Sequence, residues 1–298
     1  MRSQRLFASA GILLGASMPW TVRAQVAASP PWDSVAAILQ TPAVQGAGYQ
    51  RYNFPRRDLH LTIGAIAVSP ALALGAWAGF DGDAHLAMMM GDLVLTTAEL
   101  GPVLSELSRQ RIGVMAIHNH LVGETPPITY VHFHAEGDPV DLAHRLDRVL
   151  ARTATPRPVS PSPAGPLRID ASAVFKALDL TGRAQGDVAQ ASLILVPDRV
   201  TLHGWTLVPA LAYATPINVE SLGGGRALAS GDFALLARQV GPVLDSLAAH
   251  GITATGLHSH LIGEEPRLYF VHFWADAPLP DVLVGLRAAI DGARDATP

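Results

Sequence analysis

The chain has 298 residues, no cysteine, and a formal net charge of −4 from 21 basic and 25 acidic residues. The lack of cysteine excludes disulfides, cysteine-ligated zinc, thiol catalysis and a lipidated N-terminal cysteine. We expect no nucleic-acid partner, because phosphate binding needs concentrated positive charge and Lys176 is the only lysine.

Residues 1–24 have the pattern of a secretory signal peptide. Two arginines precede an apolar run over residues 6–18, which is too short to span a bilayer, and small residues mark a cleavage site after Ala24. We therefore expect a periplasmic or secreted protein that begins near Gln25 and has no stable membrane insertion after cleavage. An uncleaved anchor is the alternative. Residues 3–7 resemble a twin-arginine signal with one arginine replaced, so the export route, general or twin-arginine, stays open.

In chain order, the predicted elements of the next 120 residues are strands over 59–68 and 86–95, a helix over 96–110, strands over 112–120 and 128–135 joined by a turn, and a helix from Asp138. The first helix has Thr96 and Glu99 at the spacing of a capping box. Pro102 is expected to kink this helix or delay its start. The second helix begins at an Asp-Pro pair that suits its N-terminus.

The same unit then occurs a second time. Residues 91–134 align with residues 231–274 without gaps at a constant offset of 140, and 18 of the 44 positions are identical. The predicted organisation is one unit over residues 32–152, a proline-rich linker over 153–169 that is stiff and solvated, and a second unit over 170–295. Each unit is predicted to be α+β, with helices on one face of an antiparallel sheet, and a pseudo-twofold axis is expected to relate the two units.

A histidine cluster recurs in the two units. Histidines at positions i and i+2 of a strand point to the same face, so His118 and His120 should lie together, with His132 opposite on the next strand and Glu124 at the turn. The second unit repeats this set as His258, His260, Glu264 and His272. Three imidazoles and a carboxylate suit a divalent transition metal, and this ligand type fits Zn, Cu, Mn, Fe and Ni.

Several functions fit this pattern. The leading hypothesis is an exported metal-binding protein, with one site of three histidines and a glutamate in each unit or one composite site. A metal-dependent enzyme, hydrolase-like, is the second, in which Glu124 or Glu264 would act as general base toward a metal-bound water. The third is a metal-free module that binds a small molecule. The spacing also resembles the first cupin motif, but the long preceding helix argues against that fold.

Other residues receive structural predictions. The methionines at 88–90 are expected in a buried strand, and His203 is assigned a surface or capping role. Asp92 and Asp232, each after a glycine, are expected at a turn or a helix entry, and the alternative is that they support the metal ligands as neighbouring acids. Because of His134, which Trp274 replaces in the second unit, the first site is expected to bind metal more tightly or with another geometry.

The sequence also resembles a known bacterial family through three runs: Met-Met-Gly-Asp-Leu-Val-Leu at 89–95, Ala-Ile-His-Asn-His at 116–120 and Val-His-Phe at 131–133. The family is a domain of unknown function that includes the mycobacterial lipoproteins LppY and LpqO. The resemblance implies an exported bacterial protein and no established chemistry. Because lipoproteins need a cysteine after the signal, this chain departs from that branch.

Overall fold

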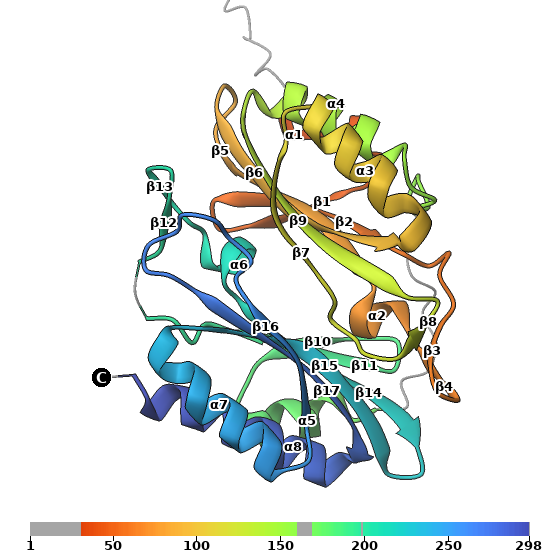
Figure 1. The fold of residues 1–298 in the computed structure, drawn as a ribbon, viewed down its shortest axis with the longest axis vertical. Coiled ribbons are helices and arrows are strands. Elements are labelled where there is room, and N and C mark those ends of the chain that lie inside the picture. The colour runs from red at the N-terminus through yellow and green to blue at the C-terminus, as the bar shows by residue number, and fades with distance from the viewer. Residues whose placement is uncertain (1–30, 160–168, 198, 298) are drawn as a thin grey trace, which may run out of the picture.

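The computed structural model describes residues 31–159, 169–197 and 199–297. Two antiparallel sheets face each other, and helices cover their outer faces, so the layers run helix, sheet, sheet, helix (Figure 1). The predicted signal peptide lies outside the described residues.

The first unit contains a six-stranded sheet with the strand order β1-β2-β5-β6-β9-β7, all of whose pairs are antiparallel. Its strands are β1 (Ala43–Gly46), β2 (Tyr49–Pro55), β5 (Gly75–Gly82), β6 (Ala87–Thr96), β7 (Gly113–His118) and β9 (Ile128–Gly137). Its outer face is covered by α1 (Pro31–Leu39), α3 (Thr97–Arg109) and α4 (Pro139–Leu150). Smaller elements of this unit are β3 (Leu61–Ile63), β4 (Ile66–Val68), β8 (Glu124–Thr125) and α2 (Pro70–Ala73).

The second unit repeats this topology with the strand order β10-β11-β14-β15-β17-β16. Its sheet contains β10 (Gly182–Gln185), β11 (Val188–Leu193), β14 (Thr215–Gly223), β15 (Arg226–Leu235), β16 (Thr253–His258) and β17 (Tyr269–Pro278). Its helices are α5 (Ala171–Leu178), α6 (Pro209–Ala212), α7 (Ala237–Ala249) and α8 (Leu279–Asp295), and its small hairpin is β12 (Thr201–Leu202) with β13 (Trp205–Thr206). The duplicated α+β architecture is therefore confirmed.

The helix after β6 forms where the sequence predicts it. The Thr96 backbone N–H donates to Glu99 Oε2 at 2.8 Å, which satisfies one of the free donors at the start of the helix. Val103 and Leu107 are buried against the sheet. The expected delay caused by Pro102 is wrong, because α3 begins at Thr97 and continues past the proline.

Two predicted details of the strands are wrong. The segment 59–68 is a hairpin of β3 and β4 rather than one strand, and Gly64 makes its turn with a φ of +58°. His118 lies opposite Tyr130 rather than His132, because a bulge between Val114 and Ala116 shifts the register of β7 against β9.

The linker is shorter than predicted. Beyond α4, the chain still packs on the first unit: the Ala154 N–H donates to Glu99 Oε1 at 2.7 Å, and the Val159 N–H donates to Gln40 O at 2.9 Å. Thr155 is buried there. Residues 153–159 are therefore part of the first unit's surface rather than a solvated linker.

The two units contact each other reciprocally. α2 of the first unit contacts β14 and β15, while α6 of the second unit contacts β6. The side chains of Gln190 and Asn218 donate to the Ala71 and Leu72 carbonyls of α2 at 2.8 and 3.0 Å. A shared apolar cluster places Met88 and Met90 of β6 against residues of the second unit, which confirms the buried methionine strand.

Candidate metal centre

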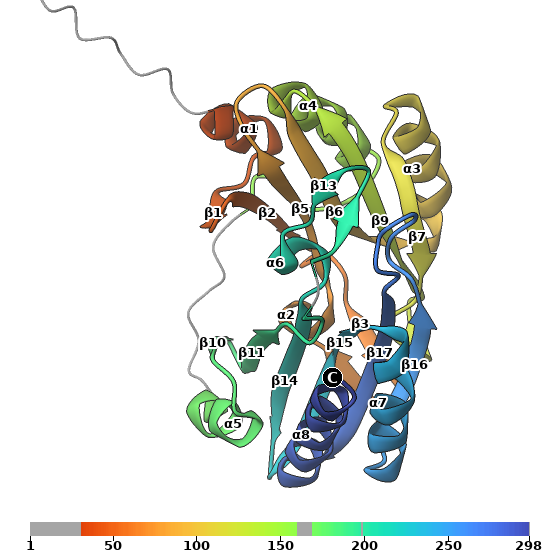
Figure 2. The same cartoon turned by 90° about the vertical axis from the view of Figure 1, so that its left-hand side faces the viewer.

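Six histidines meet where the inner faces of the two sheets come together. β7 and β9 supply His118 and His132, and the equivalent strands β16 and β17 supply His258 and His272. His120 and His260 lie two residues beyond the ends of β7 and β16. We call this set the six-histidine cluster: His118, His120, His132, His258, His260 and His272. Figure 2 shows β7 and β16 on the same side of the molecule, where the units meet.

The cluster is arranged about the pseudo-twofold axis. The rings of His118 and His258, which are equivalent positions, have their centroids 4.1 Å apart. His120 lies 3.9 Å from His272, and the equivalent pair, His132 and His260, is also separated by 3.9 Å. Each of these close pairs joins one unit to the other, so the cluster is a composite of both units.

The ring nitrogens are close enough to share an ion. His272 Nε2 lies 3.2 Å from His258 Nε2 and 3.2 Å from His260 Nε2. Two nitrogens bound tetrahedrally to one zinc at about 2.0–2.1 Å are about 3.3 Å apart. Ligand atoms of His118, His258, His260 and His272 all lie within 4.8 Å of one another, and so do those of His118, His120 and His132. His118 therefore belongs to both groups.

Four nitrogens of the cluster are buried without a hydrogen-bond partner among the described residues. They are Nδ1 and Nε2 of His118, Nε2 of His120 and Nε2 of His132. A buried polar atom that lacks a partner costs free energy, and folded proteins contain few of them. Their concentration at one point makes this a candidate site for a ligand.

Burial favours the neutral form of five rings of the cluster, those of His118, His120, His132, His258 and His260. Burial, reinforced by the neighbouring imidazoles His272 and His258, lowers the pKa of His132 to about 3, and burial lowers the pKa of His258 to about 4. Burial also lowers the pKa of His118, His120 and His260. A neutral imidazole has a free lone pair, so these rings are ready to bind a metal at neutral pH.

A carboxylate orients part of the cluster. Asp232 of β15 pairs in register with His272 of β17, and Asp232 Oδ1 accepts a hydrogen bond from His272 Nδ1. The same oxygen lies 3.4 Å from His120 Nδ1 in the other unit. A carboxylate on the far nitrogen fixes the tautomer and orientation of an imidazole and leaves its other nitrogen free for a metal.

Asp92 occupies the equivalent position of the first unit, opposite His132. Its Oδ1 is buried without a partner, and burial together with the nearby Asp232 raises its pKa well above the usual range. The expected turn or helix-entry role is wrong for both aspartates, since each lies inside a strand that faces the histidines. The sequence did contain a signal that these aspartates face the histidines. Each is a charged residue in an apolar segment, and it recurs at the offset of 140.

The two glutamates hydrogen-bond to the backbone of their own loops. Glu124 Oε1 accepts from the Ile128 N–H at 3.3 Å, and Glu264 Oε1 accepts from the Leu268 N–H at 3.0 Å, so each carboxylate closes the loop between its two histidine-bearing strands. Among the described residues, neither belongs to a group of candidate ligand atoms within 4.8 Å of one another. Their predicted ligation of the same metal therefore finds no support in this geometry.

His134 also differs from its expectation. It lies one strand repeat beyond His132 on β9, and its ring is grouped with Glu136 and His203 rather than with the six-histidine cluster. The extra histidine of the first unit thus does not add a ligand to that cluster.

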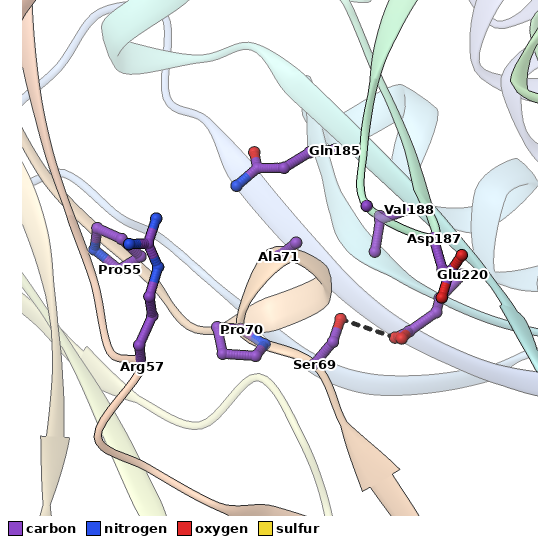
Figure 3. Close-up of a pocket in the computed structure, with 10 residues that line it drawn as sticks. Pro55, Arg57, Ser69, Pro70, Ala71, Gln185, Asp187, Val188 and Glu220 are labelled. Carbon is purple, nitrogen blue, oxygen red and sulfur yellow. Dashed lines mark hydrogen bonds between the residues drawn. The ribbon is translucent and has the colours of Figure 1, made fainter. Parts of the chain in front are cut away.

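A separate cavity of about 360 Å³ lies where α2 meets β11 and β14 (Figure 3). Arg57, Asp187 and Glu220 line it, and Ser69 Oγ donates to Glu220 Oε2 at 2.9 Å. No member of the six-histidine cluster lines this cavity. Over the described part of the chain, none of the helices combines the length and apolar character needed to cross a membrane.

Comparison with curated proteins gives no significant match. Among solved structures, a trimeric bacterial microcompartment shell protein, PduB, aligns at 11% sequence identity and a TM-score of 0.21, covering 85% of this chain and 90% of that chain. So low a TM-score carries no inference. A family described as Domain of Unknown Function (DUF1259) matches twice, over residues 33–152 and 172–292. The chain therefore belongs to this domain-of-unknown-function family and contains two tandem copies of its unit.

Proposed function

We propose that the protein is an exported metal-binding protein whose six-histidine cluster holds a divalent transition metal of the Zn, Cu, Ni, Mn or Fe class. The observation that carries this proposal is the convergence of six imidazoles, four of whose nitrogens are buried without a partner. Neutral nitrogen donors suit these ions, whereas Mg²⁺ and Ca²⁺ prefer oxygen ligands. Asp232 supports the proposal because carboxylate–histidine pairs are typical beside bound metals.

The geometry favours one shared ion over one ion in each unit. His118 belongs to both ligand groups, and its ring is only 4.1 Å from that of His258. Two dications held by groups that share His118 would lie close together, and in a buried site they would repel each other strongly unless anions bridged them. Asp232 is the only carboxylate within a cluster group among the described residues.

The proposal also includes export of the protein and its relation to two named members of the family. The N-terminal pattern of residues 1–24 supports cleavage near Gln25 and a periplasmic or secreted protein, and N-terminal sequencing of material from the periplasm or culture medium tests this. Within the family, the sequence runs quoted above support a closer relation to LppY and LpqO.

Metal-dependent hydrolysis is the second candidate. The pairing of Asp232 with His272 favours it, because the same arrangement tunes catalytic zinc sites. In that case a metal-bound water would be the nucleophile, with Glu124 or Glu264 as general base through an intervening water. A metal-free cluster that binds a small molecule is the third possibility, and the following titration separates it from the other two.

The test uses tag-free protein stripped with a chelator and titrated with each metal ion alone. We expect the cluster to bind one ion per chain at micromolar or lower concentration. His118→Ala should weaken this binding by at least about tenfold, because it removes a ligand common to both groups. The double variant His118→Ala, His258→Ala should lose the same single equivalent rather than two.

The matched control is His144→Ala, which removes an exposed imidazole from α4 on the outer face. It should bind as the wild type does. Wild-type protein that takes up none of these ions would contradict the metal proposal, and loss of two cluster equivalents in the double variant would contradict the shared site.

A further inference from the structure

A second group of candidate ligands lies outside the six-histidine cluster. It contains His134 and Glu136 of β9 and His203, which occupies the turn between β12 and β13 in the other unit. The nitrogens of His134 and His203 lie 3.5 and 3.6 Å from Glu136 Oε1. The ligand atoms of all three residues lie within 4.8 Å of one another. We call this group the outer site.

The three side chains differ in exposure. The His134 side chain is only 8% exposed, and its Nε2 is buried without a hydrogen-bond partner. The side chains of Glu136 and His203 are 34% and 54% exposed. One fixed imidazole therefore points from the interior toward a carboxylate and an imidazole at the surface, and solvent can reach the point between them.

The outer site is not a by-product of the duplication. In the second unit, Trp274 and Asp276 stand at the positions of His134 and Glu136, and in the first unit the β3–β4 turn has Gly64 where the β12–β13 turn has His203. His203 adopts a φ of +50°, close to the +58° of Gly64. A histidine thus occupies a left-handed position that glycine adopts freely.

We propose that His134, Glu136 and His203 form a second metal site for a borderline divalent ion such as Zn²⁺, Cu²⁺ or Fe²⁺. Two imidazoles and a carboxylate are a known ligand set for these ions, and three protein ligands leave positions for water. The site joins the two units, because β9 belongs to the first and the β12–β13 turn to the second. It does not depend on metal binding by the six-histidine cluster.

The test compares His203→Gly with wild type in titrations of chelator-stripped protein with Zn²⁺ alone, followed by calorimetry and elemental analysis. Glycine restores the residue type of the equivalent turn and suits the positive φ, so the variant should fold normally. We expect it to lose one Zn²⁺ equivalent, or to bind that equivalent at least tenfold more weakly. Glu136→Gln should weaken the binding of the same Zn²⁺ equivalent. His144→Ala should change neither the number of Zn²⁺ equivalents nor their affinity.

The two metal proposals fail separately in this experiment. The outer site is wrong if His203→Gly and Glu136→Gln both give the wild-type isotherm, whatever His118→Ala does. If His203→Gly loses or weakens one equivalent while His118→Ala gives the wild-type isotherm, the outer site stands and the cluster proposal is contradicted. A wild-type protein that binds neither Zn²⁺ nor any of the other ions named for the two sites overturns both.

Discussion

Asp232 is the residue through which the two halves of the cluster are connected. It accepts from His272 in its own unit and lies 3.4 Å from His120 in the other. Replacement of Asp232 by Asn keeps the shape but removes the charge, so the orientation and basicity of His272 should suffer. We expect Asp232→Asn to weaken metal binding by about 10–100-fold without loss of stoichiometry.

Competition with a chelator of known affinity measures this effect. The matched control is Asp245→Asn, which changes an exposed aspartate on α7. An affinity of Asp232→Asn equal to that of the control would show that the carboxylate does not tune the site.

The alternation of side chains along a strand made the common face of the histidines predictable. His132 shares a face with Tyr130, and His118 lies opposite Tyr130, so all these side chains point between the sheets even though the expected partner was off by two positions. The roles of Asp92 and Glu124 were not predictable in this way. Their neighbours come from other strands and loops, and a turn propensity read along the chain does not contain those contacts.

At the scale of elements, β6 and β15 show why a glycine precedes both Asp92 and Asp232. A Cβ on Gly91 would lie 2.3 Å from the Trp77 carbonyl oxygen and 2.4 Å from a ring carbon of Phe133. On Gly231 it would lie 2.0 Å from the Pro216 carbonyl oxygen. The glycine permits the close packing of the sheet with its core, and the aspartate after it faces the histidines.

We therefore expect Gly91→Ala to lower the free energy of unfolding by about 1–3 kcal/mol, because backbone and ring must both move. Gly101→Ala in α3 is the control, since a Cβ there meets nothing within 4 Å and alanine favours a helix by about 0.5–1 kcal/mol. Urea denaturation compares the two. Equal stability of the two variants would contradict the packing argument.

Periodicity along the chain predicted α3, β6, β7 and β9, whereas β1, β2 and β5 of the same sheet were not predicted. The α3 helix and the strands β6 and β9 lie within a residue or two of their predicted bounds. The β3–β4 hairpin was missed because a single glycine, Gly64, is the only turn residue in an otherwise strand-like segment. The docking of one sheet on the other depends on surfaces from both units, and no pattern within one unit specifies it.

On the scale of the whole molecule, the buried imidazoles link stability to pH. Burial lowers the pKa of His132 to about 3 and that of His258 to about 4, whereas a histidine in an unfolded chain titrates near about 6.5. Below that value the unfolded chain binds more protons than the folded protein. Stability is therefore complete above about pH 7 and falls as the pH decreases from about 6.5 toward these lower values.

For His132 alone, the expected loss between pH 7.5 and pH 5 is up to about 2 kcal/mol. Urea midpoints of the metal-free protein at the two pH values measure the total loss of stability, to which His132 contributes. His144→Ala should show the same pH dependence as wild type. An unchanged midpoint at pH 5 would mean that these imidazoles are hydrated rather than enclosed.

The twofold arrangement of the cluster has a consequence for the origin of the chain. Each unit carries three of the six imidazoles. The three closest pairs across the axis each contain one histidine from each unit. A gene that encoded a single unit would therefore complete the cluster only by self-association into a homodimer. After fusion of two such genes, the two halves would no longer need to be identical. His134 and Trp274, which differ at equivalent positions, are an example of such divergence.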